Sequence, residues 1–81
     1  MDQTTKKLGS ELEKNVEQLR ALRDEVRLKV HLAKMDVKDR WHELEPRVSA
    51  VVEQAARSAS EASRTAVDEA IHALEKLRSS L

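Results

Sequence analysis

Apolar residues recur along this chain at intervals of eleven, in three interleaved series. The series are Leu8, Leu19, Val30, Trp41, Val52, Ser63, Leu74; Glu11, Leu22, Ala33, Leu44, Ala55, Ala66, Leu77; and Asn15, Val26, Val37, Val48, Ala59, Ala70, Leu81. Eighteen of these 21 positions are apolar, and steps of three, four and four residues place them on one face of a helix. Because eleven residues over three turns slightly exceed the ideal helical period, a bundle of such helices should be nearly straight. The pattern predicts an all-α chain with one amphipathic stripe.

A capping motif indicates where the first helix begins. Glu13 stands three residues after Ser10, so the serine hydroxyl can accept a free backbone N–H while the glutamate reaches back to the cap. We therefore expect residues 10–81 to form the helical region. Residues 1–9 are expected to form a flexible N-terminal arm.

The single proline, Pro46, lies near the middle of the chain. Proline has no backbone N–H and disfavours helical geometry at the preceding residue, but it is well tolerated at the first position of a helix. This predicts a helical hairpin, with helix 1 at about 10–44 and helix 2 at about 46–79. The alternative is one long continuous helix kinked at Pro46, which the unbroken apolar phase across the proline favours.

A hairpin alone buries one seam, too little apolar area to offset the conformational entropy of ordering the chain. Two hairpins that pack their stripes together would form an antiparallel four-helix bundle, a coiled-coil homodimer. The residues expected at this oligomer or partner interface are Leu19, Leu22, Val26, Val30, Val37, Trp41, Leu44, Val48, Val52, Leu74 and Leu77.

Composition excludes most catalytic chemistry. The 81 residues include no cysteine, one glycine and one aromatic residue, Trp41, which excludes disulfides, thiolate metal sites, glycine-rich phosphate loops and β-rich folds. The histidines, His31, His42 and His72, do not have the spacing of metal ligands on one helix. No serine or threonine is paired with a base in an expected pocket. We therefore expect no enzyme, no cofactor and no metal.

Charge is balanced overall, with 15 basic and 15 acidic residues, but basic residues follow the apolar series by one position along the first predicted helix. The residues of this basic edge are Arg20, Arg23, Arg27, His31, Lys34 and Lys38. The edge could bind an anionic partner. Alternatively, its long side chains could flank the core and pair with nearby carboxylates.

These observations favour a cytoplasmic structural, scaffold or adaptor module that acts by self-association and by binding another helical protein. Two other classes stay open. Eleven-residue amphipathic repeats with Ala and Ser on the weaker side resemble, in pattern, those of exchangeable apolipoproteins and phasins, which implies a protein that coats a lipid or polymer surface. A small nucleoid-type nucleic-acid binder would use the basic edge, although net positive charge and stacking aromatics are lacking.

Overall fold

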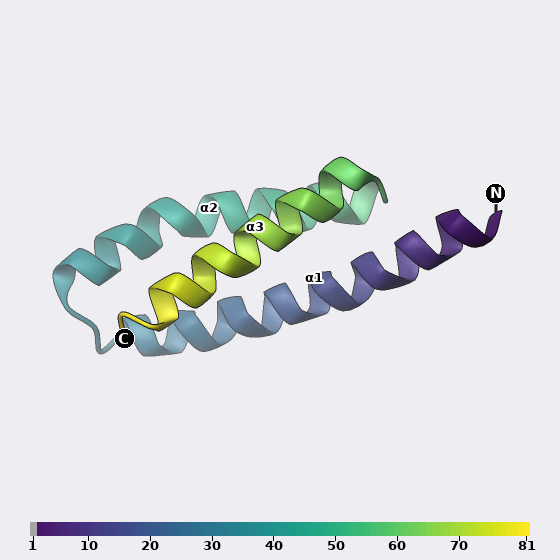
Figure 1. Ribbon diagram of the computed structural model, residues 1–81. Coiled ribbons are helices and arrows are strands. Elements are labelled where there is room, and N and C mark those ends of the chain that lie inside the picture. Colours follow the sequence, from purple (N-terminus) through teal and green to yellow (C-terminus); the bar gives the residue numbers. More distant parts are fainter. Residues whose placement is uncertain (1) are drawn as a thin grey trace.

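Residues 2–81 fold into a bundle of three helices. The computed structural model describes the backbone of residues 2–81 and the side chains of residues 10–81. The helices are α1 (Asp2–Val30), α2 (Met35–Arg57) and α3 (Glu61–Arg78). The chain runs up, down and up, so α1 and α3 are parallel and α2 is antiparallel to both (Figure 1). The Cα atoms span 49 × 16 × 15 Å, and the all-α class expected from the sequence is confirmed.

The predicted two-helix hairpin and the four-helix bundle made from it are wrong. The chain reverses direction twice, at residues 31–34 and at residues 58–60, so neither break is at Pro46. One chain with three helices can surround its own core, whereas a hairpin needs a second copy. The expected helix start at Ser10 is also wrong, because α1 begins at Asp2 and includes Ser10 as an exposed interior residue.

Pro46 lies inside α2, which continues for eleven residues beyond it to Arg57. Its ring is exposed, and so is His42, whose carbonyl would accept the missing N–H bond in an ordinary helix. Exposure allows water to satisfy that carbonyl, which makes the proline tolerable although still unfavourable. The alternative prediction is therefore right in one respect: the helix continues through Pro46. The chain is not one continuous helix, however, because it breaks at residues 31–34 and 58–60.

The break between α2 and α3 is made by serines. Ser58 ends α2 in an extended conformation, and Ser60 caps α3, with its Oγ accepting the Ser63 N–H at 3.2 Å. The Ser60 hydroxyl also donates to Ser63 Oγ at 3.2 Å. Short polar side chains stabilise a helix start in this way, because they replace backbone bonds that the first turn cannot make. The bond also satisfies Ser63, which is 1% exposed.

The core lies along the common axis of the three helices. Its buried apolar residues are Leu12, Leu19, Leu22, Val26, Val30, Val37, Trp41, Val48, Val52, Ala55, Val67, Ala70, Ile71, Leu74 and Leu77. Most belong to the eleven-residue series, so the predicted buried stripe faces the core in all three helices. Ala59 departs from it because it lies in the 58–60 turn, and Leu81 because it follows the end of α3.

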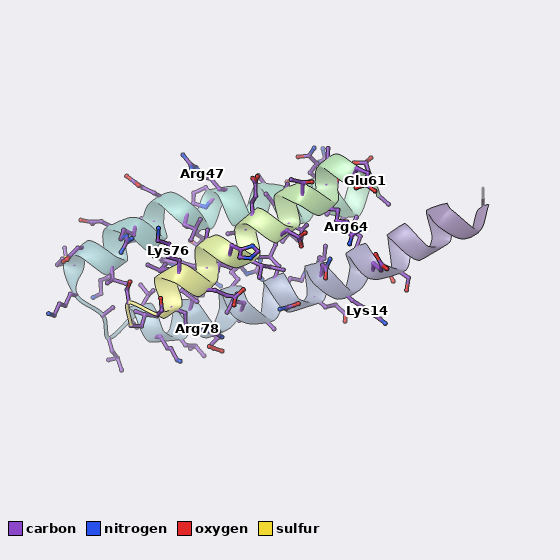
Figure 2. The ribbon with its side chains drawn as sticks, viewed as in Figure 1. Lys14, Arg47, Glu61, Arg64, Lys76 and Arg78 are labelled. Carbon is purple, nitrogen blue, oxygen red and sulfur yellow. The ribbon has the colours of Figure 1, made fainter. Side chains whose placement is uncertain are left out.

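Two surface ion pairs join α1 and α3. Glu11 pairs with Arg64 at 3.5 Å and Glu25 pairs with Arg78 at 3.3 Å, and both pairs join residues 53 positions apart in sequence. Two parallel helices in constant register produce such equal sequence separations between paired residues. Figure 2 shows Arg64 near the start of α3 and Arg78 near its end. Pairs as exposed as these contribute little to stability, so the bundle is held together by its core.

Candidate interaction surface at the turn end

Three apolar side chains lie on the outside of the bundle around the 31–34 turn. Leu32 is 95% exposed, Leu28 is 72% exposed and Met35 is 70% exposed. Leu81, the fourth large exposed apolar residue among residues 10–81, is 42% exposed and lies at the same end of the bundle (Figure 1). We call this region, made of residues 28–38 and 79–81, the turn end. It concentrates the exposed large apolar side chains of the described chain in one place.

A cavity opens beside the most exposed of these residues. Its volume is about 500 Å³, and its apolar wall is formed by Leu32, Ala33, Val37 and Leu81. Val37 belongs to the core, so the cavity connects the outer apolar residues with the edge of the bundle interior. A depression of this kind can receive an apolar side chain that a flat surface could not hold.

The remaining side chains around this cavity are mainly basic. Lys29, Lys34 and Arg78 line it, together with Ser80, and no carboxylate side chain does. Glu25 lies just outside, with its Oε2 3.7 Å from Lys29 Nζ and 3.3 Å from Arg78 Nη1. One carboxylate therefore pairs with two of the three cations, and the side chains that line the cavity, together with Glu25, carry a net positive charge.

Lys34 occupies an unfavourable position in its own helix. It is the N-cap residue of α2, with an extended backbone (φ −69°, ψ 162°), and its side chain makes no capping hydrogen bond. Helix N-termini favour Ser, Thr, Asp or Asn at the cap and repel positive charge. A lysine here lowers the stability of the first turn, since its side chain accepts none of the free N–H groups there.

The predicted basic edge is divided by the 31–34 turn. Arg20, Arg23 and Arg27 lie on α1, where Arg23 is 3.4 Å from Asp24 and Arg27 is 3.4 Å from Glu45 of α2. These ion pairs correspond to the reading in which basic side chains flank the core. The rest of the edge, His31, Lys34 and Lys38, lies within the turn end.

The residues predicted for an oligomer interface lie in the core of a single chain. Ten of the eleven are buried there, and Leu44 is partly buried against the same core. The exposed apolar residues of the turn end were missed. Their signal was present in the sequence, because Leu28, Leu32 and Met35 recur at steps of four and three on the side opposite the eleven-residue series.

Three further observations concern the described residues outside the turn end. His72 Nδ1 is 2.8 Å from the Asp68 carbonyl oxygen, one turn earlier on α3, so this ring is held by its own helix. Within the described residues, no three His, Asp or Glu side chains gather as a metal site would require. A larger cavity of about 730 Å³ between α1 and the end of α2 has a mixed lining that includes Glu13, Glu17 and Arg20.

Comparison of the chain with protein-family models, with curated proteins and with solved structures gives no match. Among its described helices, none combines the length and the apolar character that crossing a membrane requires. The physical properties of the turn end are therefore the basis for any functional interpretation.

Proposed function

We propose that this protein is a non-enzymatic helical module, cytoplasmic as its sequence predicts, that binds a partner protein through its turn end. The observation that carries the proposal is the near-complete exposure of Leu32, next to Leu28 and Met35, in a chain whose other large apolar residues mostly lie in the core. Burying such side chains against a partner releases water from apolar surface and supplies the main driving force for association.

Two unusual residue choices at the same place support the proposal. Lys34 is a poor N-cap for α2, and Leu32 exposes an apolar side chain that contributes nothing to the core of an isolated bundle. Residues that break local rules of stability concentrate at functional sites, where a different requirement selects them. Their occurrence within one four-residue turn favours a binding role for that turn.

Binding of a partner at the turn end also fits the packing better than the self-association through the apolar stripe that the sequence predicts. The stripe that was expected to join two hairpins is buried within one chain. Among residues 10–81, the large exposed apolar side chains lie at the turn end. The Arg23–Asp24 and Arg27–Glu45 ion pairs likewise leave less of the basic edge for nucleic-acid phosphates.

A peptide selection tests the proposal without a known partner. A phage-displayed library of random helical peptides is selected on the wild-type protein, and each enriched peptide is measured on two variants. Leu32→Ser/Met35→Ser removes the apolar surface, whereas the control Ala50→Ser/Ala56→Ser replaces exposed alanines of α2, one of which lines the 730 Å³ cavity. All three proteins should have the same circular dichroism spectrum.

We expect the enriched peptides to lose binding to Leu32→Ser/Met35→Ser and to keep it on the control. Peptides that bind the Leu32→Ser/Met35→Ser variant as well as the wild type would place the binding surface elsewhere. A selection that enriches no peptide would also overturn the proposal.

A further inference from the structure

We infer that the partner segment at the turn end is an acidic amphipathic helix. This inference rests on the proposed function and adds the chemistry of the partner. Such a helix would place an apolar side chain in the 500 Å³ cavity beside Leu32 and its Asp or Glu side chains against the basic rim.

The rim provides the charge that selects for carboxylates. Lys29, Lys34 and Arg78 come from α1, the 31–34 turn and α3, so the cavity is surrounded by cations from three segments of the chain. The N-terminus of α2 adds a partial positive charge beside Lys34, which Asp36 in the same turn offsets in part. Carboxylates on the bound segment would also relieve the unfavourable position of Lys34 at that helix end.

The apolar part of the surface determines the shape of the segment. Leu32 projects into solvent while Val37 and Ala33 lie at the cavity wall, so the surface has one ridge and one depression. An amphipathic helix offers apolar side chains one turn apart, which can contact both sides of such a ridge. A flat bilayer surface would contact the ridge alone.

A second copy of this chain is a poorer occupant of the same surface. A two-fold contact would bring the Lys29, Lys34 and Arg78 side chains of both copies together, and like charges at close range disfavour association. The charge of the surface therefore favours a partner of opposite sign.

Fluorescence anisotropy with a charge-reversed peptide pair tests the inference. One probe is the tightest-binding peptide from the selection that loses its binding in Leu32→Ser/Met35→Ser. The other is an analogue of it in which every Asp and Glu is replaced by Lys. Each is titrated with the wild type, with Lys29→Gln/Lys34→Gln and with the control Lys14→Gln/Arg47→Gln. Lys14 lies on α1 far from the turn end, and Arg47 lies on the outer side of α2 (Figure 2). The control and Lys29→Gln/Lys34→Gln lower the net charge of the protein by the same amount.

We expect the selected peptide to be rich in Asp and Glu and to bind the wild type at least about tenfold more tightly than its lysine analogue, with a preference that declines as salt is added. Lys29→Gln/Lys34→Gln should remove most of this preference, and the control should keep it. Equal binding of the two peptides would overturn the acidic specificity and leave the proposed function intact. A preference that survives Lys29→Gln/Lys34→Gln would also overturn it.

A vesicle assay separates a protein partner from a membrane. The protein is sedimented with phosphatidylcholine vesicles prepared with and without phosphatidylserine, and no Leu32-dependent binding is expected. Sedimentation with the phosphatidylserine vesicles that is lost in Leu32→Ser would instead assign the surface to an anionic bilayer.

Discussion

Replacing Pro46 with alanine should stabilise the protein substantially. Pro46 is the twelfth residue of α2, with full helix on both sides, and its missing N–H leaves the His42 carbonyl without an intrahelical partner. Alanine restores that bond and removes the clash of the ring with the preceding turn. Because Pro46 is exposed, the substitution leaves the core packing unchanged.

The size of the effect follows from the position. In a helix interior, alanine is favoured over proline by about 3 kcal/mol, and part of that difference is already relieved in a bundle that has adapted to the proline. We expect a gain of about 2–3 kcal/mol in the free energy of unfolding. For a domain of this size, that corresponds to a rise in Tm of at least about 8 °C.

The assay is urea denaturation followed by far-UV circular dichroism, with Tm measured in parallel. The transition midpoint should rise while the m-value stays constant, because the surface exposed on unfolding is the same. Ala50→Pro, at another exposed position in α2, is the reverse control and should destabilise by a similar amount. If Pro46→Ala instead has no effect or destabilises, Pro46 begins a helix, as in the hairpin, and the three-helix arrangement is refuted.

Three other measurements test the fold. In a denaturation assay, Leu19→Ala should lower the free energy of unfolding by about 2–5 kcal/mol because Leu19 is fully buried. Leu32→Ala should change it by no more than about 0.5 kcal/mol, and similar losses for the two variants would contradict the burial of Leu19 and the exposure of Leu32. Ser60→Ala should cost about 1 kcal/mol and Ser60→Asp almost nothing, with equal losses arguing against a cap at this residue. Small-angle scattering with light scattering should give a 9.2 kDa particle close to 49 Å long, whereas about 120 Å would indicate one continuous helix.

The buried face of the molecule could be predicted from the sequence because burial follows helical period. The eleven-residue spacing depends on which side of a helix faces apolar surroundings, and it is insensitive to whether those surroundings are another chain or the same one. Ser63 shows how strong the pattern is, because it takes its buried place in the series although it is polar. The number of helices could not be obtained from the same signal.

The positions of the breaks were harder to predict, for a different reason at each. Residues 31–34 read His-Leu-Ala-Lys, without the glycine, proline or asparagine that usually marks a turn, and the apolar phase continues across them. Pro46 supplied a strong local signal that tertiary packing overrides. At the second turn the signal was available, since Ser60 and Ser63 have the spacing of a cap and the residue whose N–H it accepts.

The 31–34 turn has basic residues that the sequence analysis identified and an exposed position for Leu32 that only the fold reveals. His31, Lys34 and Lys38 already stood out as basic, but on a continuous helix they are part of a long edge. The chain reversal separates them from Arg20, Arg23 and Arg27, and it places Leu32 at the tip of the bundle.

An ordinary turn between two helices would have polar residues at its tip and a capping side chain at the start of the second helix. This turn has leucine and lysine at those positions. The lysine weakens the start of α2 and the exposed leucine adds nothing to the core, whereas both side chains suit the apolar, negatively charged segment that we propose as the partner. Under the binding role that we propose for the turn end, the missing cap at Lys34 is a loss of stability accepted in exchange for binding.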